Sequence, residues 1–144
     1  MKRKRDVKSR KVKKHKARLN IDGSRMQHGK HCEQTYAPVA SWNSMRLLLA
    51  MVVRHKWKTK QLDCVFAFPQ APVEREIYMK IPAGIELDGA RKEDHCLQLH
   101  RNVHGQKQSG RVWNKHLTKI LIGKVGFKQS KVDECVFYLS LIHI

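Results

Sequence analysis

A single carboxylate, that of Asp63, lies inside a mostly apolar stretch, QLDCVFAFPQAP at residues 61–72. It is the only acidic residue between Glu33 and Glu74. An ionised carboxylate is costly to bury unless it pairs with a cation or binds a metal ion. Two interpretations compete: an Asp at an exposed strand end that pairs with a Lys or Arg, or a ligand of a hard cation such as Mg²⁺ at a sheet edge. The second arrangement serves nucleotidyl transfer, in which two metal ions stabilise the attacking and leaving oxygens.

Positive charge dominates the composition, with 30 Lys and Arg against 12 Asp and Glu and a formal net charge of +18. Residues 1–18 hold 11 of these cations and a single Asp. Lys and Arg that contact phosphates release counterions, so this charge is typical of a protein that binds nucleic acid. The alternative is a solvated tail or a basic localisation cluster. Because the rest of the chain is also basic, the charge favours nucleic acid.

Length and composition exclude several classes of protein. The 144 residues suit one domain or a piece of a larger one, and 41% hydrophobic residues suffice for a core. No apolar run reaches the about 20 residues of a membrane span, and no apolar signal segment follows the basic N-terminus. The four cysteines form no CxxC pair and indicate free thiols, and the His and Cys spacings fit no standard zinc site. We expect an intracellular protein, in a cytoplasmic particle or the nucleus.

Two helices are predicted from apolar residues that recur at three- and four-residue steps. The first follows Ser41 or Asn43, either of which can cap it. The second is expected over residues 110–125, with Ser109 as its cap and Gly126 at its end. The two apolar stripes comprise Trp42, Met45, Leu48, Leu49, Val52 and Val53, and then Trp113, Leu117, Ile120 and Leu121. Since two of the three tryptophans lie on these stripes, we expect them to pack in the core rather than to stack on bases.

Several strands are predicted around these helices. Residues 57–68 alternate at first and then become apolar on both faces, which is typical of a strand that enters a core. Pro69 ends that strand. Further strands are expected at 12–21, 76–82, 95–100 and 135–139, with a loop over 23–34 and an extended piece over 35–40. This order, without repeats, predicts an α+β fold with a mixed sheet and two main helices.

The string QLDCVFAFPQAPVEREIYMKIPAGI resembles the region around the first catalytic aspartate of copia-type retrotransposon reverse transcriptases. Other blocks resemble this family in the same order. HKARLNIDGSRM is similar to its basic fingers strand, QTYAPVASWNSMRLLLAM to the next loop and helix, LQLHRNVHGQKQSGRVWNKHL to a turn into a helix, and GFKQSKVDECVFY to the segment before its second catalytic motif. Blocks in the right order are a specific signal. The resemblance implies the fingers and the N-terminal part of the palm of a right-hand polymerase, within a Pol polyprotein.

The resemblance also implies roles for single residues. Asp63 corresponds to the first metal-binding aspartate, and the carbonyls of Cys64 and Val65 contribute to the same site. Two Mg²⁺ ions in the complete enzyme would stabilise the attack of a primer 3′-hydroxyl on the α-phosphate of a deoxynucleoside triphosphate. Phe68 corresponds to an aromatic residue under the incoming sugar, where it would exclude a 2′-hydroxyl. From spacing alone Phe68 would be a core aromatic.

Two cations and a turn complete the nucleotide site that the resemblance implies. Lys16 and Arg18 fall in the fingers strand that clamps the triphosphate. Gly105 and Gln108 match the turn that packs on the nucleotide and the template. A glycine there would let the backbone approach a base closely.

Parts of the family pattern are absent from this sequence. His104 stands where Tyr is usual, and Gly110 where Pro is common. The second catalytic motif, an aromatic, a variable residue and then Asp-Asp, does not occur. We therefore expect a fragment truncated before the second catalytic hairpin, without thumb, connection or RNase H regions, inactive and aggregation-prone alone. Its implied partners are an RNA or DNA template-primer and other Pol segments such as integrase. The alternative is a small basic non-catalytic nucleic-acid-binding protein.

The sequence divides into three parts. Residues 1–11 are expected to be a basic N-terminal tail and residues 12–138 the N-terminal portion of a reverse transcriptase domain. The codons CTG TCT CTT ATA CAC ATC would encode residues 139–144, LSLIHI, and that DNA string resembles a transposase adapter used to prepare sequencing libraries. We therefore expect residues 139–144 not to be native. As protein, the same segment could equally end a strand.

Overall fold

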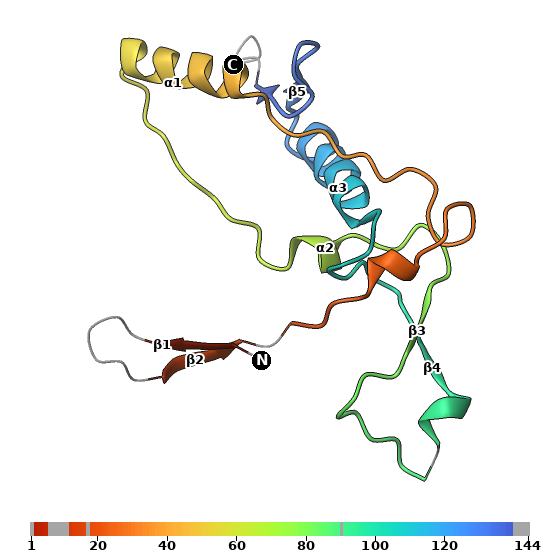
Figure 1. Cartoon of the computed structure of the whole chain (residues 1–144). Helices are drawn as coiled ribbons and strands as arrows, with labels where there is room; N and C mark the ends of the chain where they lie inside the picture. The colour runs from red at the N-terminus through yellow and green to blue at the C-terminus, as the bar shows by residue number, and fades with distance from the viewer. Residues whose placement is uncertain (1, 6–11, 17, 90, 140–144) are drawn as a thin grey trace.

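The computed structural model describes residues 2–5, 12–16, 18–89 and 91–139. In chain order its elements are β1 (Lys2–Arg5), β2 (Val12–Lys16), η1 (Gly23–Arg25), α1 (Trp42–His55), α2 (Ala67–Gln70), β3 (Tyr78–Lys80), η2 (Lys92–Asp94), β4 (Cys96–Gln98), α3 (Ser109–Gly123), β5 (Lys128–Gln129) and β6 (Phe137–Tyr138) (Figure 1). Of the segment expected not to be native, residues 140–144 lie outside the described residues, and Leu139 is exposed.

The strands pair into two-stranded antiparallel sheets, β1–β2, β3–β4 and β5–β6. In β3–β4, Tyr78 lies opposite Gln98 and Lys80 opposite Cys96. The mixed sheet that the sequence predicts is therefore wrong for the described residues. Each of these strands is at most five residues long and pairs with the strand beside it in the sequence. Residues 2–5, expected to lie in a tail, form β1.

Four predicted strands are confirmed, each shorter than expected. They correspond to β2 within residues 12–21, β3 within 76–82, β4 within 95–100 and β6 within 135–139. The loop that follows β2 contains one 3-10 turn, η1, which Asp22 caps by accepting the N–H of Ser24 at 3.1 Å.

Helix α1 is confirmed, together with its cap. The Oγ of Ser41 accepts the N–H of Ser44 at 3.0 Å, and Lys56 ends the helix in the left-handed conformation, with φ 54°. The apolar stripe of α1, however, is open to solvent, with Trp42 72% and Val53 78% exposed. The expectation that the tryptophans pack in a core is therefore wrong for Trp42, because no described element covers this face.

Helix α3 is confirmed, but its first residue has a different role from the expected one. Ser109 lies inside the helix, and Gln108 occupies the cap position without a side-chain hydrogen bond. The Ser109 hydroxyl instead lies 2.9 Å from the carbonyl oxygen of Val103. The helix ends at Gly123, and Gly126 adopts φ 83° in the following turn.

The predicted strand over residues 57–68 is wrong. Residues 57–64 have no regular structure and are exposed, and the chain then enters the short helix α2. Phe66 precedes α2 in the left-handed conformation, with φ 53°, which turns the chain out of an extended path. The apolar residues of 57–68 have no partner strand in the described part of the chain, and Leu62 is 89% exposed.

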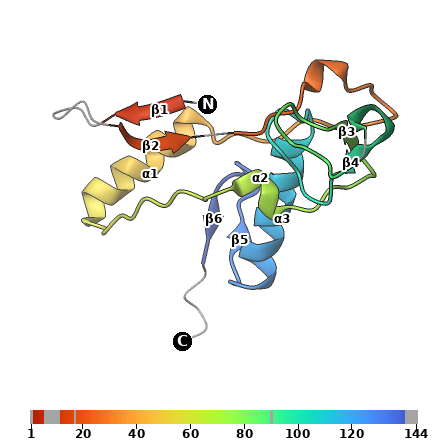
Figure 2. The same cartoon turned by 90° about the horizontal axis from the view of Figure 1, so that it is seen from below.

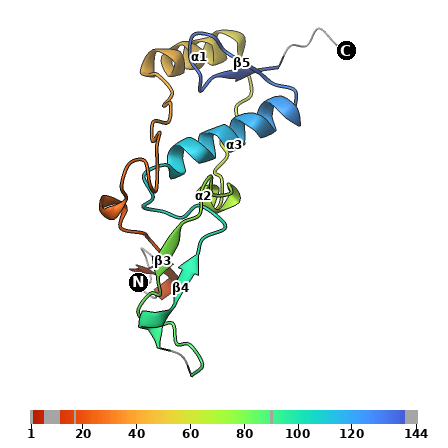
Figure 3. The ribbon, with the colours of Figure 1, turned by 90° about the vertical axis from the view of Figure 1, so that its right-hand side faces the viewer.

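The buried residues lie around the end of α2, the start of α3 and the base of the β3–β4 hairpin. Met26, Cys32 and Ile77 form an apolar cluster against which Leu99 packs. Figures 2 and 3 show α2 beside α3, and Figure 3 shows the β3–β4 hairpin projecting away from both. No helix in the described residues is long and apolar enough to cross a membrane.

Candidate functional site

Three chain segments come together at one place: residues 20–26, residues 66–73, which include α2, and residues 101–109 (Figure 3). The third segment is a turn that contacts both of the others. The N–H of Ile21 donates to the carbonyl oxygen of His104 at 2.8 Å, which joins the first segment to the turn. Residues far apart in the sequence are thereby brought to one place.

Gly105 lies where the turn comes closest to the backbone of Ile21. Its φ is +94°, a conformation that L side chains rarely adopt, and a Cβ here would lie 2.0 Å from the carbonyl oxygen of Ile21. A Cβ on Gly23 would in turn lie 2.1 Å from the carbonyl oxygen of Gly105. Contact with the protein's own backbone therefore requires glycine here, a reason that the sequence did not predict.

Buried side chains close the turn from inside. The Oε1 of Gln106 accepts the N–H of Val103 at 3.1 Å. The hydroxyl of Ser109 lies 2.9 Å from the carbonyl oxygen of Val103 and 3.1 Å from the same Gln106 Oε1, its two available acceptors. Gln106 and Ser109 are 5% and 1% exposed. The shape of the turn is thus fixed by its own residues.

The start of the turn is tied to the chain that leaves α2. Asn102 is fully buried, and its Nδ2 donates to the carbonyl oxygens of Ala71 at 3.1 Å and Pro72 at 2.7 Å. Its backbone N–H donates to the Ala71 carbonyl at 3.1 Å. Beside it, Nη1 of Arg101 donates to the carbonyl oxygen of Gln70 at 3.1 Å. The end of α2 is therefore held by consecutive residues of the turn.

Phe68 lies in α2, half-buried, and faces the turn. Its ring meets the ring of His104 edge-on, with centroids 5.0 Å apart and planes at 63°. The structure therefore brings Phe68 next to the turn that contains Gly105. Both residues belong to the nucleotide site that the sequence resemblance implies.

Asp63, Cys64 and Val65 lie just before α2 on an exposed, irregular stretch. The carboxylate of Asp63 has no ion-pair partner within the described residues. The carbonyl oxygen of Val65 accepts the Nε2 of Gln70 at 2.7 Å, so one of its two lone pairs is used within the chain.

These residues do not by themselves fit Mg²⁺. The ion takes about six oxygen ligands in a near-octahedral arrangement and commonly uses more than one carboxylate. The described part of the chain contains no group of three or more His, Cys, Asp or Glu side chains placed to hold a metal. Asp63 supplies one carboxylate, which alone leaves most positions around such an ion unfilled.

The two cations expected to clamp the triphosphate, Lys16 and Arg18, precede the segment that contacts the turn. Lys16 ends β2, and its side chain lies outside the described structure. Arg18 is exposed. It stands two residues before Asn20, which forms an isolated parallel bridge with His104.

Gln108 faces another part of the molecule. It is 5% exposed, its Nε2 lies 3.5 Å from the carbonyl oxygen of His31, and its Oε1 has no partner among the described residues. It lines a polar cavity of about 310 Å³. The other lining residues are His31, Cys32, Glu33, Gln34, Glu74, Arg75 and Arg111. The structure thus directs the Gln108 amide towards residue 31 rather than towards Phe68.

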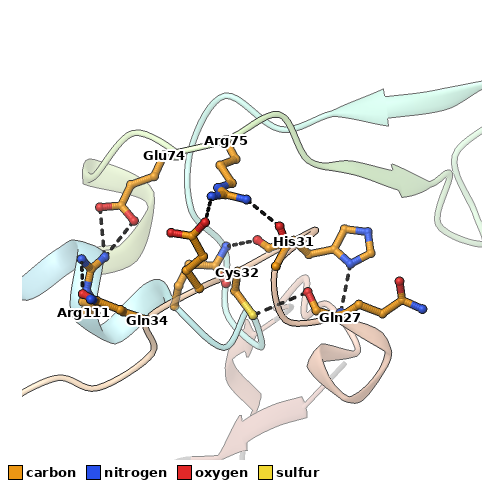
Figure 4. A network of polar contacts seen from close by, with 10 residues as sticks. Gln27, His31, Cys32, Gln34, Glu74, Arg75 and Arg111 are labelled. Atoms are coloured by element: carbon orange, nitrogen blue, oxygen red, sulfur yellow. Dashed lines mark hydrogen bonds and ion pairs between the residues drawn. The ribbon is translucent and has the colours of Figure 1, made fainter.

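Two arginines organise this cavity (Figure 4). Arg111, 17% exposed, donates to both carboxylate oxygens of Glu74 at 2.9 and 3.2 Å and to Oε1 of Gln34 at 2.9 Å. Arg75 pairs with Glu33. Sequence reasoning missed these pairs, because no spacing rule links residues so far apart. One signal was available in the sequence: Glu33 and Glu74 are the nearest acidic residues on either side of Asp63.

A second carboxylate ties α1 to the C-terminal hairpin. Oδ2 of Asp133 accepts the N–H of Ser41 at 2.9 Å, and its Oδ1 accepts the N–H of Cys135 at 2.9 Å. Hydrogen bonds from the Ser44 hydroxyl and from these two N–H groups hold the pKa of Asp133 below its ordinary value. This contact links the N-terminus of α1 with the β5–β6 hairpin.

The sequence of residues 1–140 matches the family described as reverse transcriptase (RNA-dependent DNA polymerase). The chain belongs to this family. It is 33% identical over 127 residues to the retrovirus-related Pol polyprotein from transposon RE2 of Arabidopsis thaliana, which covers 88% of this chain and 8% of the relative. It is 29% identical over 128 residues to the corresponding polyprotein from transposon TNT 1-94 of Nicotiana tabacum, with 89% and 9% covered. The resemblance to copia-type retrotransposon reverse transcriptases is confirmed.

The chain therefore spans less than a tenth of the length of these Pol polyproteins. No solved structure matches it. The reverse transcriptase family nevertheless gives a context for the contact between α2 and the turn, since both segments lie within residues 1–140 that match the family.

Proposed function

We propose that this chain is the part of an RNA-directed DNA polymerase that supports the incoming deoxynucleotide and supplies one metal-binding carboxylate. The observation that carries the proposal is the contact between α2 and the 101–109 turn. It places Phe68 against His104 and next to Gly105 in a chain of the reverse transcriptase family. In this proposal the ligands are a template-primer and deoxynucleoside triphosphates, and the remaining Pol segments are its partners.

Each residue of the proposed site has a physical task. The flat ring of Phe68 lies under the sugar and leaves no room for a 2′-hydroxyl. Gly105 keeps the turn close to the segment that follows β2 and carries Arg18, and Arg18 with Lys16 attracts the triphosphate. The net charge of +18 favours binding of the template-primer.

Asp63 is proposed as a ligand of Mg²⁺ in the complete polymerase, where it acts with carboxylates that this sequence does not contain. In that complete polymerase, two such ions would stabilise the attacking and leaving oxygens of phosphoryl transfer. The sequence has no consecutive aspartates. We therefore propose that the 144-residue chain alone does not extend primers.

The test uses a fusion in which residues 139–144 are replaced by the segment that follows the matching position in the RE2 Pol polyprotein. We expect this fusion, called the RE2 fusion below, to extend a DNA primer on an RNA template in Mg²⁺, and the 144-residue chain not to. Asp63→Asn should abolish extension by the RE2 fusion while template-primer binding persists. Asp88→Asn, also at an exposed aspartate, is the matched control.

Two results would refute the proposal. One is an inactive RE2 fusion that binds nucleic acid normally, as a non-catalytic nucleic-acid-binding protein would. The other is primer extension by the Asp63→Asn variant at the rate of the Asp88→Asn control.

A further inference from the structure

The position of Phe68 depends on a short series of hydrogen bonds that leads out of α2. The N–H of Ala71 donates to the carbonyl oxygen of Phe68 at 3.1 Å. The carbonyl oxygen of Ala71 then accepts both the N–H and the Nδ2 of Asn102, each at 3.1 Å. Since Ala71 is fully buried, water cannot replace these bonds.

Asn102 has the strongest hold on this segment. It is fully buried, and its Nδ2 also donates to the carbonyl oxygen of Pro72 at 2.7 Å. Pro72 has no backbone N–H, so it cannot anchor this segment as a donor. The bond that its carbonyl oxygen accepts from Asn102 anchors the segment instead. The neighbouring Arg101 makes a single bond to this region and is exposed.

The orientation of the Asn102 amide follows from its partners. Both hydrogens of Nδ2 point at carbonyl oxygens, so the reversed amide would place Oδ1 against two acceptors. In the actual orientation Oδ1 is buried without a partner among the described residues. An unpartnered buried acceptor destabilises the fold, which indicates that the donor function of this side chain is what matters.

The same residue also lies in the turn that contacts Phe68. Asn102 stands two residues before His104, whose ring meets the Phe68 ring at 5.0 Å. Asn102 thus sets the position of Phe68 through α2 and the position of its ring partner through the turn.

We propose that Asn102 is a positioning residue that holds Phe68 in place and thereby sets the discrimination between deoxynucleotides and ribonucleotides. This inference rests on the proposed function, in which the Phe68 ring excludes a 2′-hydroxyl. Asn102 does not touch the nucleotide. Its effect on selectivity passes through Phe68.

The test compares kcat/KM for a deoxynucleoside and a ribonucleoside triphosphate in the RE2 fusion. We expect Asn102→Ala to lower the ratio of the two values by about tenfold, because loss of the Nδ2 bonds lets α2 shift beneath the sugar. Asn102→Ser keeps a shorter donor that can serve one carbonyl, so its ratio should be intermediate. A merely structural loss of folded enzyme lowers both values equally and leaves the ratio unchanged.

Two comparisons make the test specific. Val112→Ala removes part of a side chain that is 5% exposed in α3, so it should lower activity towards both nucleotides without changing the ratio. In a Phe68→Ala background, Asn102→Ala should not change the ratio further, because the residue through which it acts is gone.

The outcomes separate the inference from the function on which it rests. An inactive parent fusion that binds template-primer normally refutes the proposed function and the inference with it. An active parent whose Asn102 variants keep the parental ratio refutes only the inference. So does an effect of Asn102→Ala that persists in full when Phe68 is alanine.

Discussion

The close approach of the turn to the loop after β2 predicts a large local effect of Gly105→Ala. The residue has φ +94°, and a Cβ would lie 2.0 Å from the carbonyl oxygen and 3.0 Å from the amide nitrogen of Ile21. Alanine in the left-handed region costs about 1–2 kcal/mol. Because the obstructing atoms are backbone, the two segments must also separate, which breaks the bond from Ile21 to His104 and costs about 1 kcal/mol more.

The expected total is about 2–3 kcal/mol of local stability, or roughly 30- to 150-fold in the opening equilibrium. Hydrogen exchange of the Ile21 amide reports this opening directly, because that N–H is the donor to His104. We expect its protection in the 144-residue chain to fall by this factor, or to disappear if the wild-type protection is smaller.

Gly84→Ala is the matched control. Gly84 has φ +92°, nearly the same as Gly105, but nothing lies within 4 Å of its Cβ position. The conformational cost is therefore similar, the steric cost is absent, and the site is far from Ile21 in the sequence. Equal protection of the Ile21 amide in the Gly105→Ala and Gly84→Ala variants would refute the argument that the turn is built on this contact.

Three further predictions concern other contacts. The pKa of Asp133 lies below its unfolded value of 3.8, so the hydrogen bond from the Ser41 N–H to its carboxylate is complete above that pH and is lost as the pH falls through the lower folded-state value. Hydrogen exchange of the Ser41 amide should show this loss, and Asp133→Asn should remove the pH dependence. Val53→Lys on the exposed face of α1, where Val53 is 78% exposed, should reduce self-association in light scattering without loss of helix in circular dichroism. Alanine variants of Arg111 and Glu74, alone and together, should give a coupling energy of about 0.5–1 kcal/mol in urea unfolding, because Glu74 is 44% exposed; additivity would contradict the contribution of the pair.

The helices could be predicted from the sequence because their signals are local. The cap of Ser41 and the stripe that begins at Trp42 lie within one segment, and the structure confirms α1 over Trp42–His55. What the sequence did not predict is the exposure of that stripe. Apolar periodicity shows that a face can be buried, but burial depends on a second element, and none in the described residues covers it.

The predictions from sequence failed where contacts between distant residues decide the conformation. The capping rule assigned Ser109 to the N-terminal cap of α3, but its hydroxyl donates to the carbonyl of Val103 in the preceding turn. Residues 57–68 have the composition of a strand, but no described strand pairs with them, and Phe66 turns the chain into α2. Composition alone could not reveal either competing contact.

The candidate site was predictable to different degrees. The family resemblance named Phe68 and Gly105, which the structure brings to one place. Asn102 carries no motif signal, since an asparagine in a turn is ordinary and its donors reach residues thirty positions away. Such a residue becomes visible only when its burial and its acceptors are known.

The surroundings of Asp63 bear on the role of its carboxylate. Leu62 is 89% exposed and Phe66 73%, so covering this segment would gain about 25 cal/mol per Å² of apolar surface. Covering Asp63 as well would cost several kcal/mol unless a cation came with the cover. A bound metal ion and an arginine of another Pol segment both meet that condition. They differ in thermal unfolding of the RE2 fusion: if Asp63 binds Mg²⁺, the ion raises the Tm of the parent but not of Asp63→Asn, and without Mg²⁺ the variant is at least as stable as the parent. If Asp63 forms an ion pair, Asp63→Asn lowers the Tm with or without Mg²⁺, and the proposed metal role is wrong.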